Sequence, residues 1–128
     1  VAACGATCVA GIESRGFIFG AAVAQRASVP MLLIRKPGKL PRDIHTESYE
    51  LEYGTDSLEL HQQDCGKGDR VFLIDDLLAT GGTAGAAAAL VEKTGADVSG
   101  FGFMIELGFL DGRDKLEQHD VYSLVTYD

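Results

Sequence analysis

Residues 71–83 read VFLIDDLLATGGT, an apolar run followed by two acids and a turn of small residues. Four consecutive apolar residues without alternation predict a strand at 71–74 that is covered on both faces, as in a parallel sheet. The Ala-rich segment after this stretch predicts a helix that ends near Gly95, because glycine is common just past a helix C-terminus. A second apolar run at 98–105 completes a strand–loop–helix–strand unit.

The same order of elements recurs before this unit. Residues 8–12 and 30–34 read as strands, and the loop ESRG and a helix at 16–26 lie between them. Near the C-terminus we expect a short helix at 114–118 and a last strand at 121–125. Alternating strands and helices predict an α/β fold, a mainly parallel sheet flanked by helices. Ligands of such sheets bind beyond the carboxyl ends of the strands, where both ESRG and DDLLATGGT lie.

A long polar stretch, residues 36–63, separates the two units. Its later part alternates polar and apolar residues, which predicts an antiparallel hairpin exposed on one face. Its start is basic, since Arg35, Lys36, Lys39 and Arg42 place four of the eleven basic residues of the chain within eight positions. A local basic cluster in an acidic protein favours a small anionic ligand, although a solvated basic loop would have the same composition.

Composition sets the class of protein. The chain has 128 residues, of which 46% are hydrophobic and 23% charged, which predicts one globular domain over residues 1–128. The net charge of −8 argues against nucleic acid as a partner, since backbone binders carry a basic excess. No apolar run is long enough for a membrane span and no secretory signal is visible, so we expect a cytoplasmic protein with no membrane partner. Three cysteines without zinc-type spacing argue against structural zinc and a disulfide framework.

The loop after the strand at 71–74 has the chemistry of a phosphate site. Gly81 and Gly82 allow backbone N–H groups to converge on an anion, Thr80 and Thr83 add hydroxyl donors, and the following helix contributes its positive end. The loop is neither the lysine-containing loop of ATPases nor a dinucleotide-binding turn. The adjacent carboxylates, residues 75–76, would repel a phosphate, so we expect them to face sugar hydroxyls or Mg²⁺. A ligand with a phosphate beside a ribose diol satisfies both halves of the loop.

The same stretch, VFLIDDLLATGGT, resembles the phosphoribosyl-pyrophosphate signature of the type I phosphoribosyltransferase family. Three further segments are similar to the members of that family that use adenine. They are GIESRGFIFG at 11–20, RKPGKLP at 35–41 and ESYELEYGTDSLELH at 47–61. The resemblance covers residues 11–127, and it implies the family's fold with a flexible hairpin loop over the active site. It also implies transfer of a phosphoribosyl group from phosphoribosyl pyrophosphate to adenine, which yields AMP and pyrophosphate.

The resemblance implies a role for each loop. Asp75 and Asp76 match the residues that bind the ribose hydroxyls of phosphoribosyl pyrophosphate. The residues that match the 5′-phosphate loop are Ala79, Thr80, Gly81, Gly82 and Thr83. The residues that match the pyrophosphate side are Ser14, Arg15, Arg35, Lys36 and Lys39. Mg²⁺ is the implied cofactor, carried mainly by the substrate near the two aspartates, with no protein ligand assigned.

The base side is implied by the segment LEYG. Glu52 matches a glutamate near N7 of adenine, where a carboxyl group can assist the proton transfer that N9 alkylation requires. Tyr53 beside it would pack over the site or on the hairpin. Residues 36–54 resemble a mobile lid, whose closure would exclude water from the reacting centre. The family also implies a homodimer.

Three alternatives stay open at this point. The base could be hypoxanthine, guanine, xanthine or orotate instead of adenine. The chain could be a regulator that senses phosphoribosyl pyrophosphate without catalysis, although no nucleic-acid-binding element is visible. It could also fold without turning over, because the N-terminal hood that covers the purine in the adenine-using members has no counterpart among these residues. We therefore expect a complete sugar-phosphate side and a half-present adenine pocket.

Overall fold

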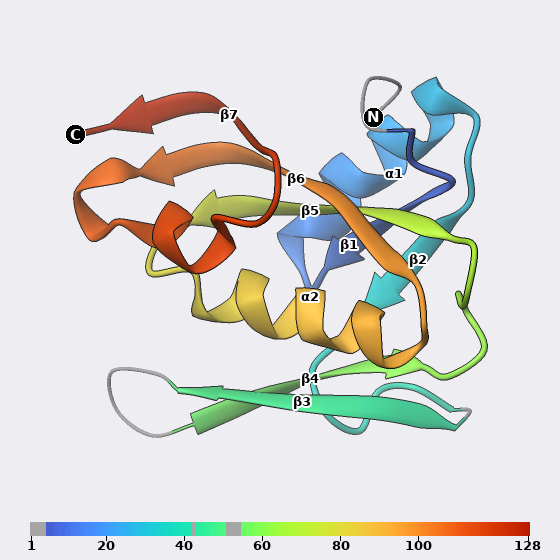
Figure 1. Ribbon diagram of the computed structural model, residues 1–128. Helices are drawn as coiled ribbons and strands as arrows, with labels where there is room; N and C mark the ends of the chain where they lie inside the picture. The colour runs from blue at the N-terminus through green and yellow to red at the C-terminus, as the bar shows by residue number, and fades with distance from the viewer. Residues whose placement is uncertain (1–4, 42, 51–54) are drawn as a thin grey trace.

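The computed structural model describes residues 5–41, 43–50 and 55–128. Within these residues, a five-stranded parallel sheet has the order β2-β1-β5-β6-β7, and an antiparallel pair, β3-β4, lies apart from it (Figure 1). The elements in chain order are β1 (Cys8–Ile12), α1 (Arg15–Ala27), β2 (Met31–Ile34), β3 (Ile44–Glu50), β4 (Thr55–His61), β5 (Arg70–Leu78), α2 (Gly82–Lys93), β6 (Asp97–Leu107), the 3-10 helices η2 (Gly108–Leu110) and η3 (Gly112–Leu116), and β7 (Val121–Tyr127). The predicted α/β class and parallel sheet are confirmed.

Both faces of the central strand β5 are buried, as its uninterrupted apolar run predicts. Val71 and Leu73 belong to the larger core cluster, which also contains α2 and residues of the hairpin such as Leu58. Phe72 and Ile74 belong to a second cluster on the α1 side. Figure 1 shows α2 between the main sheet and the β3-β4 hairpin, so the hairpin covers the outer face of that helix. The sheet, α2 and the hairpin therefore form three layers on this side.

β5 differs from the prediction at its end, which is the part that matters for the site. The strand was expected to end at Ile74, with the two aspartates in the loop, but it continues to Leu78. The extension follows from its neighbour, since β6 runs to Leu107 and pairs with β5 as far as Leu78 opposite Glu106. Asp75 and Asp76 are therefore held by a sheet ladder. The predicted helix at 114–118 is also placed differently, as the 3-10 helix η3.

The first turn of α1 lies directly against the end of β5. A Cβ atom added at Gly16 would come within 2.7 Å of the Ile74 carbonyl oxygen and 3.2 Å of the Asp75 carboxylate. Such a distance is far below van der Waals contact, so only glycine allows this approach. Because Arg15 begins α1, the contact also brings its side chain to the aspartates.

We expect Gly16→Ala to lower the free energy of unfolding by about 1–3 kcal/mol, the usual cost of forcing a methyl group into packed structure. The matched control is Gly85→Ala in α2, where a Cβ meets nothing within 4 Å. That change should be neutral or stabilising by roughly 0.5–1 kcal/mol, because alanine favours a helix interior. Urea unfolding of both variants checks the difference, and equal effects would contradict the close approach.

Among the described residues, no helix has the length and apolar character needed to cross a membrane.

Candidate active site

Two adjoining cavities open at the carboxyl edge of the parallel sheet. One, of about 220 Å³, follows the loop from Asp75 through Ala84 and includes Arg15. The other, of about 300 Å³, is lined by Glu13, Ser14, Arg15, Lys36, Asp75, Asp76 and Thr83. The two cavities share Arg15, the two aspartates and Thr83. Three loops that are distant in sequence thus meet around one pair of carboxylates.

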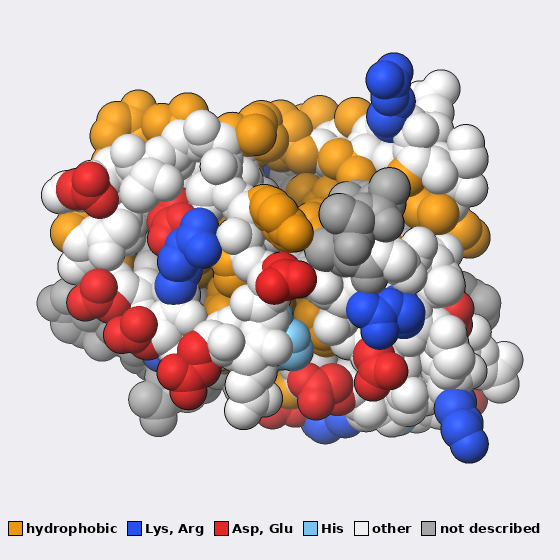
Figure 2. All heavy atoms as spheres, turned by 45° about the horizontal axis from the view of Figure 1, so that its top comes forward, with side chains coloured by type: hydrophobic (Ala, Val, Ile, Leu, Met, Phe, Trp, Pro, Cys, Tyr) orange, Lys and Arg blue, Asp and Glu red, His pale blue; other side chains and the backbone are white. Residues whose placement is uncertain are grey.

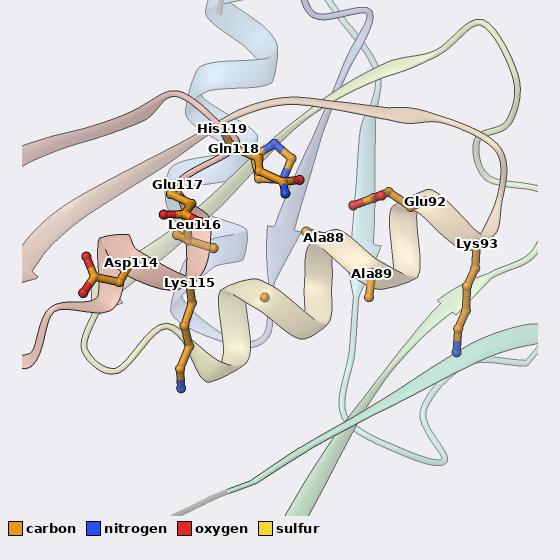
Figure 3. Close-up of a pocket in the computed structure, with 11 residues that line it drawn as sticks. Ala88, Ala89, Glu92, Lys93, Asp114, Lys115, Leu116, Glu117, Gln118 and His119 are labelled. Carbon is orange, nitrogen blue, oxygen red and sulfur yellow. The ribbon is translucent and has the colours of Figure 1, made fainter.

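A larger cavity lies elsewhere. It measures about 610 Å³ and runs between α2 and residues 114–119, as Figure 3 shows. None of the residues predicted for the site lines it. Size therefore does not select the candidate site, which is defined here by the convergence of charged and glycine-rich loops.

The backbone of the loop between β5 and α2 suits the predicted role in binding an anion. Gly81 precedes α2 with a φ of 88°, a left-handed conformation that suits glycine, and no side chain caps this helix end. The first N–H groups of a helix have no partner within the helix, and the helix dipole places partial positive charge there. Thr80 is exposed, Thr83 is half-buried, and both residues line the smaller cavity.

The two aspartates differ in their surroundings. Asp76 forms an ion pair with Arg15, with 2.8 Å between Oδ2 and the guanidinium Nε. Asp75 accepts a hydrogen bond of 2.8 Å from the backbone N–H of Asp76. Burial, with a smaller contribution from the neighbouring Asp76, raises the pKa of Asp75 to about 7. Asp75 is therefore a half-buried, poorly solvated carboxylate that would gain from hydroxyl donors of a ligand.

Glu13 organises the basic segment, a role that the sequence analysis missed. Its side chain is only 8% exposed, and it accepts hydrogen bonds from Arg35 Nε at 3.3 Å and from the Lys36 backbone N–H at 2.8 Å. Lys39 Nζ also contacts this carboxylate. Burial alone would raise the pKa of Glu13, but the hydrogen bonds from Lys39 and Lys36 hold it below its usual value. One signal was available, since Glu13 directly precedes Ser14 and Arg15 at the end of a strand.

Lys36 connects the same segment to the hairpin. Its ammonium group donates to Tyr49 Oη and to Asp56 Oδ2, each at 2.8 Å. The backbone of Arg35 exchanges two hydrogen bonds with Glu59 of β4. The predicted lid region, 36–54, thus contains β3 and is tied to the edge of the sheet where the cavities open. Arg42, Glu52 and Tyr53 lie outside the described residues, so their predicted roles stay predictions.

The four described cations of the site already have carboxylate partners. Arg15 pairs with Asp76, Lys36 pairs with Asp56, and both Arg35 and Lys39 contact Glu13. Because Arg15 and Lys39 keep 74% and 46% of their side chains exposed, these ion pairs are accessible to water and to ligands. An incoming polyanion could therefore exchange with the carboxylates for these cations.

We expect Lys36→Met to weaken binding of inorganic pyrophosphate about tenfold, since a charge-assisted contact to phosphate is lost. Methionine keeps the length of the side chain, so the apolar stem still packs. The matched control is Lys67→Met, an exposed lysine before β5 that removes the same charge far from both cavities. Isothermal titration with pyrophosphate and Mg²⁺ measures the difference. Equal affinity in the two variants would contradict the assignment of Lys36.

Comparison with known proteins defines the class. Residues 5–124 match the sequence profile of the family described as "Phosphoribosyl transferase domain". The chain therefore belongs to the phosphoribosyltransferase family.

Within this family, the chain is similar to adenine phosphoribosyltransferases. The chain is 53% identical over 122 residues to adenine phosphoribosyltransferase of Synechococcus, and the match covers 95% of this chain and 71% of the relative. It superimposes on the crystal structure of adenine phosphoribosyltransferase from Thermoanaerobacter pseudethanolicus with a TM-score of 0.91 and 52% identity, covering 93% of this chain and 69% of the other. The chain also superimposes on the Saccharomyces cerevisiae enzyme in complex with an imino-altritol bisphosphate and adenine. The TM-score is 0.89 and the identity 41%, and the match covers 93% of this chain and 67% of the other.

Proposed function

We propose that this protein is an adenine phosphoribosyltransferase, which joins adenine to phosphoribosyl pyrophosphate and releases AMP and pyrophosphate in purine salvage. The similar proteins named above are adenine phosphoribosyltransferases, and the yeast structure holds adenine together with a bisphosphate. The sequence resemblance to the adenine-using members covers residues 11–127.

The observation that carries the proposal is the meeting of two cavities at Asp75 and Asp76. Phosphoribosyl pyrophosphate has the same order of groups: a phosphate, a ribose with free hydroxyls, and a pyrophosphate at the anomeric carbon. The start of α2 takes the 5′-phosphate, and the aspartates accept hydrogen bonds from the ribose hydroxyls. Ser14, Arg15 and the basic segment take the pyrophosphate. This arrangement holds the anomeric carbon between the two anionic ends.

The donors at the site fit Mg²⁺ that is shared with the substrate. Mg²⁺ prefers oxygen ligands and commonly uses one or two carboxylates together with substrate phosphates. Asp75 and Asp76 supply two such carboxylates beside the pyrophosphate cavity, and the described residues contain no group of three or more ligating side chains. When bound, Mg²⁺ would neutralise charge on the departing pyrophosphate.

The transfer forms the bond from adenine N9 to the anomeric carbon and breaks the bond from that carbon to the pyrophosphate oxygen. The proton that adenine loses goes to an acceptor beside N7, a role we assign to Glu52. We expect Glu52→Gln to lower kcat about 10²-fold or more with little change in KM for phosphoribosyl pyrophosphate, the usual size of general acid–base catalysis. Steady-state kinetics measures the split, and a change confined to that KM would contradict the role. The lid at 36–54 would close over this step and exclude water.

We also propose a homodimer in the cytoplasm. Large apolar side chains are exposed on the described chain, such as Leu124, which is 73% exposed. Figure 2 shows hydrophobic side chains gathered along the upper part of one face. Light scattering tests the dimer, and a monomer at micromolar concentration would contradict it. The free, buried thiols of Cys8 and Cys65 suit a reducing compartment.

A competition among bases tests the proposed specificity. The chain is given Mg²⁺, phosphoribosyl pyrophosphate and equal amounts of adenine, hypoxanthine, guanine, xanthine and orotate, and the nucleotides are separated by chromatography. AMP as the dominant product supports the proposal. A different dominant nucleotide would assign another base, and binding of phosphoribosyl pyrophosphate without any nucleotide would indicate a sensor; either result overturns it.

A further inference from the structure

Residues 108–116, which follow β6, form a wall behind the phosphate-binding loop, residues 79–83. A Cβ added at Gly112 would come within 2.4 Å of the Ala79 carbonyl oxygen, and one at Gly81 would come within 2.7 Å of the Gly112 carbonyl oxygen. The two backbones are therefore in direct contact, so neither can shift toward the other. Figure 3 shows Lys115 and Leu116 of the same short helix, η3, beside the start of α2. The position of the wall thus helps to determine the position of residues 79–81.

A buried carboxylate fixes this wall. Glu106, whose side chain is 7% exposed, lies at the end of β6 and pairs in register with Leu78 at the end of β5. Arg113 of η3 donates from Nε to both of its carboxylate oxygens, at 2.9 and 2.8 Å. Ser123 of β7 donates to the same carboxylate at 2.7 Å. These hydrogen bonds connect β6, η3 and β7 around one charge.

Arg113 carries the restraint from the carboxylate to the wall. Its Nη1 atom also donates to the Val121 carbonyl oxygen at 3.1 Å, so the guanidinium is held at two points. Gly112, which touches the phosphate-binding loop, is the residue directly before Arg113. The hydrogen bonds from Arg113 lower the pKa of Glu106, which is consistent with a carboxylate that stays charged at neutral pH. A substitution at Glu106 is therefore expected to displace Arg113 and, through the adjacent Gly112, the phosphate-binding loop.

We propose that Glu106 is a positioning residue for the phosphate-binding loop: together with Arg113 and Ser123 it holds Gly112 against Ala79 and Gly81, and so fixes the N–H groups that receive the 5′-phosphate. The inference rests on the proposed function, because it takes residues 79–83 as the 5′-phosphate site. It predicts a selective defect, since the basic residues of the pyrophosphate side come from α1 and the segment after β2, and their described ion pairs are with Asp76, Glu13 and Asp56 rather than with this network.

The test compares two probes that occupy the two sides separately. Ribose 5-phosphate reports on the 5′-phosphate side, and inorganic pyrophosphate with Mg²⁺ reports on the other. We expect Glu106→Gln, which keeps the shape and removes the charge, to weaken ribose 5-phosphate about tenfold, because hydrogen bonds to charged groups are among the stronger ones. Pyrophosphate affinity should change less than twofold. The control is Glu117→Gln, an exposed acid close to η3 that removes the same charge without touching the network.

A graded variant keeps the proposal testable if Glu106→Gln folds poorly. Ser123→Ala removes one hydrogen bond and leaves the ion pair, so it should weaken ribose 5-phosphate by a smaller factor and again spare pyrophosphate. Arg113→Lys retains the charge and should lie between the parent and Glu106→Gln. Unchanged ribose 5-phosphate affinity in folded variants, or equal loss of both probes, would overturn the positioning role. Failure of the parent chain to bind ribose 5-phosphate would instead count against the proposed function.

Discussion

Replacing both Asp75 and Asp76 with asparagine is expected to lower kcat/KM for phosphoribosyl pyrophosphate about 10³-fold, since each aspartate contributes a charged acceptor worth roughly 2 kcal/mol. Asparagine keeps the size of the side chain but accepts hydrogen bonds from the ribose hydroxyls more weakly. Steady-state kinetics with the sugar substrate varied measures this loss, and titration with phosphoribosyl pyrophosphate shows that it arises at binding.

The control for this double change is Asp97→Asn with Asp120→Asn. These exposed acids lie near the amino ends of β6 and β7, at the opposite edge of the sheet, and their replacement alters the net charge equally. The control should turn over like the parent. If the variant at residues 75 and 76 did so as well, the two cavities would not be the active site.

The single change Asp75→Asn should stabilise the free protein even as it impairs the enzyme. The pKa of Asp75 is about 7 in the folded chain, above its ordinary value of 3.8, because burial disfavours the charged form. Below pH 3.8 both states hold the proton and the group has no effect on stability. As pH rises toward 7 the unfolded state loses the proton first, so the folded state becomes progressively disfavoured, and the full cost is reached above pH 7.

Urea unfolding with a metal chelator present measures this cost. Asparagine carries no charge, so the gain in unfolding free energy should be larger at pH 8.5 than at pH 5.5, by about 2 kcal/mol. An equal gain at both pH values would contradict a buried, poorly solvated carboxylate. A destabilised variant at pH 8.5 would contradict it more strongly. The expected combination of greater stability and lower activity is typical of groups kept for function.

Much of the fold was predictable because the apolar runs are continuous. The strands at 8–12 and 71–74 are buried on both faces, and a run without alternation is the direct consequence of such burial. The meeting of the candidate loops was predictable for a related reason, since the loops at the carboxyl ends of parallel strands lie at one edge. Ser14, Arg15 and residues 75–83 are brought together there, as expected.

Other features depend on contacts between distant segments, which local patterns do not contain. The extension of β5 through two aspartates is imposed by pairing with β6, against the low strand propensity of aspartate. Glu13 reads as an ordinary loop acid until β2 brings Arg35, Lys36 and Lys39 beside it. The sequence likewise gives Glu106 no distinguishing feature, because its role depends on η3, which places Arg113 against its carboxylate. In each case the decisive partner lies far from the residue in sequence or in another element.

The most direct test of the central claim is the initial rate at which the chain forms AMP and pyrophosphate from adenine, phosphoribosyl pyrophosphate and Mg²⁺. We predict that the two products appear in a ratio of one to one, and that the Asp75→Asn, Asp76→Asn variant forms them far more slowly. Pyrophosphate release without AMP, or equal rates in the parent and that variant, would contradict it.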